Sequence, residues 1–188
     1  MIFSELGDDE LSGFVARKIA ENKVVGWFQG KMEFGPRALG GRSILGNPCD
    51  PHMKEFLNNK VKKREPFRPY APMVLEERAR DFFELSGASP FMLLAPRVRP
   101  EKKDAIPGAV HVDGTARVQT VSQGVNPKLW RLIKAFESIT GVPVILNTSF
   151  NLRGEPVVCT PEDAISSFKK SAMDYLVLGN FILDQSQN

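Results

Sequence analysis

The chain has 188 residues, of which 42% are hydrophobic and 25% charged, so it is long and apolar enough to bury one good core. Its net charge of +3 does not by itself indicate a nucleic-acid-binding protein. The two cysteines, Cys49 and Cys159, form neither a CxxC pair nor a cluster with the histidines, which argues against a zinc site and a disulfide framework. No apolar run approaches the ~20 residues of a membrane span and no signal-peptide pattern opens the chain, so we expect a cytoplasmic protein.

Apolar residues recur at helical spacing in several segments, with short β-branched runs between them. Thr160 with Asp163, and Asp50 before Pro51, predict capped helix starts, and Gly141 predicts a helix end. Predicted helices cover residues 8–23, 50–63, 126–141 and 160–173; predicted strands cover 24–28, 91–99, 117–121, 142–150 and 175–183, the last as a strand or hairpin. Strands interleaved with helices predict an α/β or α+β domain around a twisted sheet, whose strand order is not readable from these signals.

The stretch "EFGPRALGGRSIL" after the strand at 24–28 places two arginines, three glycines and a proline together. Clustered glycines indicate tight turns or close approach of another group to the backbone. Arginine forks beside such a turn suit phosphate or carboxylate. This loop is therefore a candidate anion site.

A basic segment follows in "KVKKREPFRPYAP", where prolines stiffen the chain after the basic end of a predicted helix. One interpretation is a solvated helix C-terminus favoured by the helix dipole. The other is that Arg68, between Phe67 and Pro69, is held in a defined direction toward a ligand. The run alone favours the first interpretation, and the Phe67-Arg68-Pro69 step weakens it.

Two further stretches contain polar side chains beside predicted strands. In "HVDGTARVQTV", Asp113-Gly114 predicts a turn, and Arg117 at the strand start faces a cleft or the solvent with equal weight. In "LNTSFNLRGEPVV", a buried strand leads into Asn147 and Ser149, where open α/β sheets usually bind ligands. A surface loop with Asx-type turns explains the second pattern equally well. Neither a Walker A nor a GxGxxG pattern is present.

Four stretches together resemble the C-terminal domain of carbamoyltransferases of the NodU/CmcH type, a group that includes the antibiotic O-carbamoyltransferases. They are "KMEFGPRALGGRSIL", "NNKVKKREPFRPYAP", "DGTARVQTV" and "LNTSFNLRGEPVV", in the family's order. The similarity extends from about Val24 to the end of the chain. It implies one YrdC-like domain over residues 1–188, with an N-terminal helix segment at 1–23, a twisted mixed sheet with flanking helices and a concave, positively charged nucleotide-binding face.

The resemblance also implies an activity. In the family this domain takes carbamoyl phosphate and ATP, with Mg²⁺ expected beside the nucleotide, and makes carbamoyl-adenylate, releasing phosphate and pyrophosphate. An N-terminal domain of ASKHA type then transfers the carbamoyl group to a hydroxyl of the acceptor. This chain has only the second domain. We therefore expect either that the chain is a piece of a longer protein or that the first domain is a separate polypeptide. The acceptor cannot be identified from this sequence.

By resemblance, the predicted site contains cations and polar groups from all four stretches. The implied catalytic residues are Lys62, Arg68 and Ser149; the implied residues for ATP and carbamoyl phosphate are Arg37, Arg64, Arg117, Asn147 and Gly35. The glycines at 35, 40 and 41 are expected to let the backbone approach the ligand. No carboxylate cluster marks a metal site, so the nucleotide phosphates are expected to hold most of the Mg²⁺.

Two alternatives come from other functional classes. A basic YrdC-like face could bind double-stranded RNA by shape, although this leaves the Asn147 to Ser149 cluster unexplained and the net charge is modest. The isolated domain could also be a catalytically silent docking partner. Calorimetric titrations with ATP and with short duplex RNA distinguish a nucleotide enzyme from an RNA-binding module.

Overall fold

A computed structural model describes residues 3–187 and shows one eight-stranded mixed sheet in the order β1-β8-β7-β2-β3-β6-β4-β5. The pairs β2–β7 and β4–β5 are parallel, and the other neighbours are antiparallel. The strands are Phe3–Glu5 (β1), Val25–Phe28 (β2), Arg42–Gly46 (β3), Ala71–Leu75 (β4), Gln119–Val121 (β5), Val144–Ser149 (β6), Tyr175–Leu178 (β7) and Phe181–Asp184 (β8).

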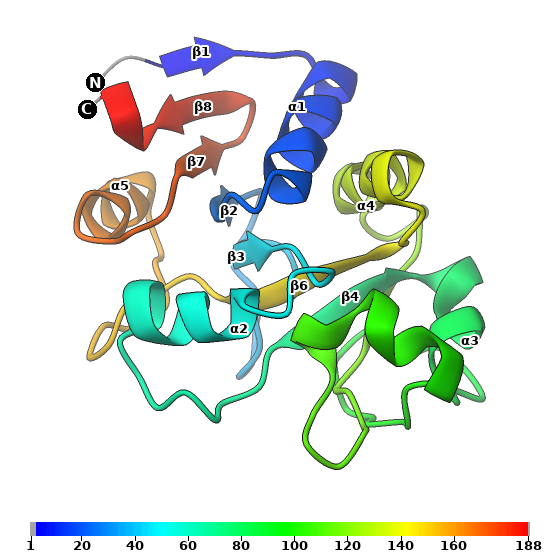
Figure 1. Ribbon diagram of the computed structural model, residues 1–188. Coiled ribbons are helices and arrows are strands. Elements are labelled where there is room, and N and C mark those ends of the chain that lie inside the picture. Colours follow the sequence, from blue (N-terminus) through cyan, green and yellow to red (C-terminus); the bar gives the residue numbers. More distant parts are fainter. Residues whose placement is uncertain (1–2, 188) are drawn as a thin grey trace.

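Helices cover both faces of this sheet (Figure 1). The α-helices are Asp8–Ala20 (α1), Met53–Phe56 (α2), Ala79–Phe82 (α3), Pro127–Thr140 (α4) and Pro161–Lys169 (α5); α2 continues as a π-helical segment, Leu57–Lys62 (η1). Short 3₁₀ turns cover Glu76–Arg78, Pro100–Ala105, Pro107–Ala109 and Gln185–Gln187 (η2–η5). In Figure 1, α1 and α4 lie side by side over one face, and α5 and α2 lie against the other.

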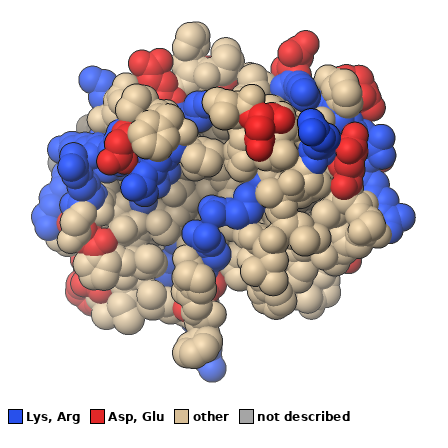
Figure 2. Space-filling view, turned by 90° about the horizontal axis from the view of Figure 1, so that it is seen from below, with Lys and Arg blue, Asp and Glu red and all other residues tan. Residues whose placement is uncertain are grey.

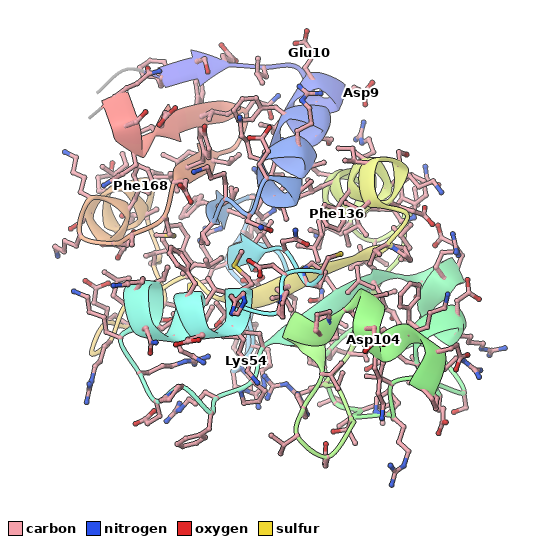
Figure 3. All side chains as sticks on the ribbon, in the orientation of Figure 1. Asp9, Glu10, Lys54, Asp104, Phe136 and Phe168 are labelled. Atoms are coloured by element: carbon pink, nitrogen blue, oxygen red, sulfur yellow. The ribbon has the colours of Figure 1, made fainter. Side chains whose placement is uncertain are left out.

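The core lies between these helices and the sheet. Phe136 of α4 and Phe168 of α5, labelled in Figure 3, are both fully buried. Removing aromatic side chains of this size from water is the largest favourable contribution that a single residue makes to such a core. The mixed eight-stranded sheet and the helices on its two faces confirm the predicted α+β fold.

Local signals predicted several helix ends correctly. Gly141 ends α4 with φ 75° as predicted, and at the start of this helix the Asn126 side chain accepts from the Leu129 N–H, a cap that was not predicted. Thr160 and Asp163 form a capping box at the start of α5. The hairpin predicted near the C-terminus is β7–β8.

Other boundaries were wrong. Asp50 accepts a hydrogen bond from the His52 N–H within a turn, so the helix predicted from it begins later, at Met53. The helix predicted over 8–23 ends at Ala20, before Asn22 with φ 63°, and the one predicted to reach Met173 ends at Lys169.

One predicted strand is absent and three were missed. Residues 91–99 form only isolated bridges, since this segment lies along β5, where the Val118 N–H donates to Leu94 O. The missed strands are β1, β3 and β4. The β3 residues belong to the glycine-rich motif, and Pro72 interrupts the donor pattern that a central strand such as β4 normally shows.

Within residues 3–187, the helices are all too short or too polar to span a bilayer.

Candidate functional site

Three arginines and three polar residues of β6 line one pocket of about 110 Å³. They are Arg37, Arg64, Arg117, Asn147, Thr148 and Ser149. The pocket wall is completed by Pro36, Ala38, Pro69, Ala71 and Met92. In Figure 2, Lys and Arg side chains gather along a hollow in the middle of the face seen from below.

The β6 residues lie within the strand rather than beyond its end as expected. Asn147 and Ser149 share one face of β6 because side chains alternate along a strand. The Asn147 side chain is 2% exposed and its Nδ2 donates to Ala38 O at 2.7 Å. Its Oδ1 is buried without a hydrogen-bond partner among the described residues. An unpaired buried acceptor is rare and costs about 1–3 kcal/mol, so it is a feature that function often explains.

Lys62, the last residue of η1, lies beneath Ser149 and not in the pocket wall. Its Nζ donates to Ser149 O at 2.8 Å, to Asn151 O at 2.9 Å and to Asn151 Oδ1 at 2.7 Å. The Ser149 hydroxyl donates to the same Asn151 Oδ1 at 2.7 Å. Burial, and then the nearby Arg64 guanidinium, lower the pKa of Lys62 to about 7, while its oxygen partners on Ser149 and Asn151 favour the charged form.

Arg64 is held by a network that the sequence did not indicate. Its Nε donates to Asn58 Oδ1 at 2.8 Å, and its guanidinium lies 4.9 Å from the centre of the Tyr70 ring. Asn58 is fully buried and donates to the carbonyls of Pro66 and Arg68, which fixes the proline-stiffened segment. Asn58 lies within the helix predicted over residues 50–63, and nothing in the sequence distinguishes it from the other polar residues there. Only its buried contacts show that it positions Arg64.

Arg117 and Arg37 approach each other across the pocket without counter-ions. Burial, and then the Arg37 guanidinium, lower the pKa of Arg117, and Arg117 Nε is buried without a partner. Neither arginine forms an ion pair with a carboxylate among residues 3–187. Two neighbouring guanidinium groups without carboxylate partners favour an anion between them.

Besides Lys62, two further predicted site residues, Arg68 and Gly35, do not line this pocket. Arg68 is 53% exposed and forms an ion pair with Glu65 at 3.0 Å. It is solvated in spite of its Phe67 and Pro69 neighbours, and its role remains a prediction. Gly35 (φ 129°) lines an adjacent hollow that shares Arg37 with the pocket.

The glycines at 40 and 41 have a packing role in place of the expected ligand approach. A Cβ on Gly40 would lie 2.6 Å from the Leu129 side chain of α4. A Cβ on Gly41 would lie 3.0 Å from Lys31 O and 3.1 Å from the Glu33 carboxyl. Both therefore allow close packing of the protein on itself.

A larger hollow of about 430 Å³ lies at the β5 edge of the sheet, and its charged lining residues are two glutamates, Glu76 and Glu77, and one arginine, Arg80. Carboxylates repel polyanions, so the smaller arginine-lined pocket is the better anion site. Within residues 3–187, no three His, Cys, Asp or Glu side chains are grouped as metal ligands.

Comparisons with known proteins identify the family of this chain. Residues 16–185 match the family model described as carbamoyltransferase C-terminus. The chain belongs to the carbamoyltransferase C-terminal family. The family resemblance of the four motifs is thereby confirmed.

Relatives of this carbamoyltransferase domain include nodulation proteins. The chain is 47% identical to nodulation protein NolO of Bradyrhizobium diazoefficiens, with 93% of this chain and 32% of the relative covered. It is 48% identical to nodulation protein U of Rhizobium tropici, with coverages of 74% and 24%. An uncharacterized protein of Synechocystis sp. is 47% identical, with coverages of 97% and 33%. The chain thus spans a third or less of the length of these relatives.

Solved structures show the YrdC-like fold. Full-length HypF in a phosphate- and nucleotide-bound form superposes with a TM-score of 0.64 at 22% identity, over 90% of this chain and 25% of HypF. P. abyssi Sua5 complexed with L-threonine superposes with a TM-score of 0.66 at 14% identity, over 94% of this chain and 48% of Sua5. At these identities the likeness concerns the fold alone.

Proposed function

We propose that this domain binds ATP and carbamoyl phosphate at the arginine-lined pocket and forms carbamoyl-adenylate, as the activating half of an O-carbamoyltransferase. The observation that supports this most directly is the convergence of Arg37, Arg64 and Arg117 on Asn147 and Ser149. Four sequence-distant motifs meet there, in a domain of the carbamoyltransferase family. The nucleotide-bound HypF structure, which shares the fold, also supports nucleotide binding.

The pocket size suits the reacting groups and not a whole nucleotide. Its volume of about 110 Å³ is below the roughly 300–1,000 Å³ typical of pockets that enclose a drug-sized ligand. It would hold the carbamoyl group and the α-phosphate, with the adenosine outside it along the hollow of Figure 2.

The proposed chemistry brings two anions together. Water first cleaves carbamoyl phosphate into carbamate and inorganic phosphate. A carbamate oxygen then attacks the α-phosphorus of ATP; a new O–P bond forms as the bond to the bridging oxygen breaks, and pyrophosphate leaves with that electron pair. Arg37 and Arg117 would reduce the repulsion between the anions and stabilise the charge that develops in transfer.

The residues beneath the pocket would orient this reaction. The charge of Lys62 lies directly below Ser149, and Asn151 receives hydrogen bonds from both. To hold an oxygen of the carbamoyl group or the α-phosphate, the Ser149 hydroxyl would turn its single proton from Asn151 Oδ1 to that oxygen, while the Lys62 ammonium would keep Asn151 Oδ1 paired. Mg²⁺ would be held chiefly by the nucleotide phosphates, because the described residues offer no carboxylate cluster.

The test is pyrophosphate release from ATP with and without carbamoyl phosphate. We expect pyrophosphate release only when both ATP and carbamoyl phosphate are present. Arg117→Ala should lower kcat/KM about tenfold or more, because one charge-assisted phosphate contact is removed. Ser149→Ala should lower turnover more than ATP affinity. Isothermal calorimetry with short duplex RNA should show no binding under conditions that detect ATP.

Absence of ATP binding by a folded sample at low salt would refute the proposal. Tight RNA binding without ATP binding would support the RNA-binding alternative. If Ser149→Ala melts much earlier but releases pyrophosphate normally, Ser149 is structural.

A further inference from the structure

The loop that connects β2 to β3, residues 29–41, presents Arg37 to the pocket although most of the loop is exposed. An exposed arginine on a loop normally samples many rotamers, and binding must then restrict it at an entropic cost. The contacts of this loop show how that freedom is reduced.

The two ends of the 29–41 loop are fastened to each other. The guanidinium of Arg42 is 4% exposed and donates to Gln29 O and Gly30 O at 3.1 Å and to Gly41 O at 3.0 Å. The Cζ atom of the same guanidinium lies 3.5 Å from the centre of the Phe28 ring. Arg42 is therefore a structural residue that closes the base of the loop.

Glu33 closes a smaller loop around Arg37. One carboxylate oxygen, Oε1, accepts hydrogen bonds from the N–H groups of Leu39 and Gly41, both at 2.6 Å. Hydrogen bonds to a carboxylate are short and roughly twice as strong as those between neutral groups. Gly41 is needed for this arrangement, since a Cβ there would lie 3.1 Å from the carboxylate.

Amide side chains of the sheet fix the same segment from below. Asn147 donates to Ala38 O at 2.7 Å, and Gln119 donates to Leu39 O at 2.9 Å. The residues that follow Arg37 are thus held by a carboxylate on one side and two amides on the other.

We propose that Glu33 is a positioning residue for anion binding, which acts by holding Arg37 beside Arg117. The two guanidinium groups repel each other when no anion is bound, so a free loop would carry Arg37 away into solvent. The Glu33 closure opposes this movement and pre-organises the cationic pair. The identity of the anion rests on the proposed function, but the positioning role does not.

Inorganic pyrophosphate is the probe, titrated into the chain by calorimetry. We expect Glu33→Ala to weaken pyrophosphate binding about tenfold or more, as when one charge-assisted contact is released. Glu33→Gln retains an acceptor oxygen and should recover most of the affinity. Glu10→Ala, at the exposed start of α1 (Figure 3), is the carboxylate control and should leave binding unchanged.

A double-mutant cycle separates positioning from general structural damage. If Glu33 acts through Arg37, then Glu33→Ala should cause no further loss in an Arg37→Ala background. Additive losses, or a pyrophosphate affinity of Glu33→Ala equal to that of the unmodified chain, would overturn the inference. Thermal unfolding of each variant identifies loss of fold. If Glu33→Ala does not fold, Glu33→Asp takes its place in the cycle, because the shorter side chain withdraws the acceptor from the Leu39 and Gly41 N–H groups.

The outcomes for this inference and for the proposed function are distinct. Coupled losses in pyrophosphate binding without carbamoyl-phosphate-dependent turnover would support the role of Glu33 and refute carbamoyl-adenylate formation. Normal turnover with additive losses would do the reverse.

Discussion

Lys62 is the residue whose charge state is most sensitive to the fold. It is 4% exposed, and burial lowers its pKa from the ordinary 10.5 to about 7. Below about pH 7 both the folded and the unfolded chain hold the proton. Between about 7 and 10.5 the unfolded chain binds more protons, so this group makes the free energy of unfolding rise with pH.

This pKa predicts a pH dependence of anion binding with the opposite sign. Sulfate affinity should fall as pH rises through about 7, because Lys62 loses its positive charge below the pocket. Lys62→Met should bind sulfate more weakly at pH 6 and lose most of this dependence. The measurement is calorimetric titration at constant ionic strength.

Lys60→Met is the matched control, since Lys60 is exposed on the same π-helical segment. It should keep the pH dependence of the unmodified chain. The difference in free energy of unfolding between the unmodified chain and Lys62→Met should rise from pH 6 to pH 9. A flat difference would mean that Lys62 stays charged, held by Ser149 and Asn151.

Among the elements, the β2–β3 connection depends on helix α4 as well as on the sheet. Gly40 has φ 106° and lies against Leu129, the residue whose N–H donates to the capping side chain of Asn126. The loop that presents Arg37 and the first turn of α4 therefore share one contact. A change at this glycine should affect stability before it affects chemistry.

Gly40→Ala should destabilise the domain by about 2 kcal/mol or more, since it combines a strained backbone with a Cβ placed 2.6 Å from the Leu129 side chain. Urea unfolding should show a lower midpoint with an unchanged slope. Gly124→Ala, where no neighbour lies within 4 Å and φ is not positive, should stay within about 0.5 kcal/mol. Equal midpoints for the two variants would contradict this account of Gly40.

At the scale of the whole molecule, the chain matches a third or less of its nodulation relatives. If activation occurs at the arginine-lined pocket and transfer requires the remaining part of such proteins, this chain alone should carbamoylate no acceptor hydroxyl. Adding a separately produced N-terminal domain should restore transfer at high protein concentration. Separation removes only the effective concentration of a tether, of order millimolar.

Mass spectrometry of the acceptor checks this division of labour. The control omits this chain. The N-terminal domain alone, incubated with the acceptor, ATP and carbamoyl phosphate, should give no carbamoylated product. Carbamoylated acceptor from this chain by itself would contradict the two-site scheme.

The sequence by itself determined the local features of this protein. The cap at Thr160 and Asp163 and the stop at Gly141 act within a few residues, so neighbouring positions suffice to predict them. The four motifs determined the family in the same way, because each is a short contiguous pattern.

Only the tertiary structure decided which residues of these motifs meet. The order β3-β6-β4-β5 brings Asn147 of β6 beside Ala71 of β4, and Arg117 lies just before β5, while the loop closed by Glu33 places Arg37 over them. Arg68, from an equally suggestive motif, instead pairs with Glu65 at the surface. Contacts between residues so far apart depend on strand order and loop closure, and short buried strands of similar composition do not encode their neighbours locally.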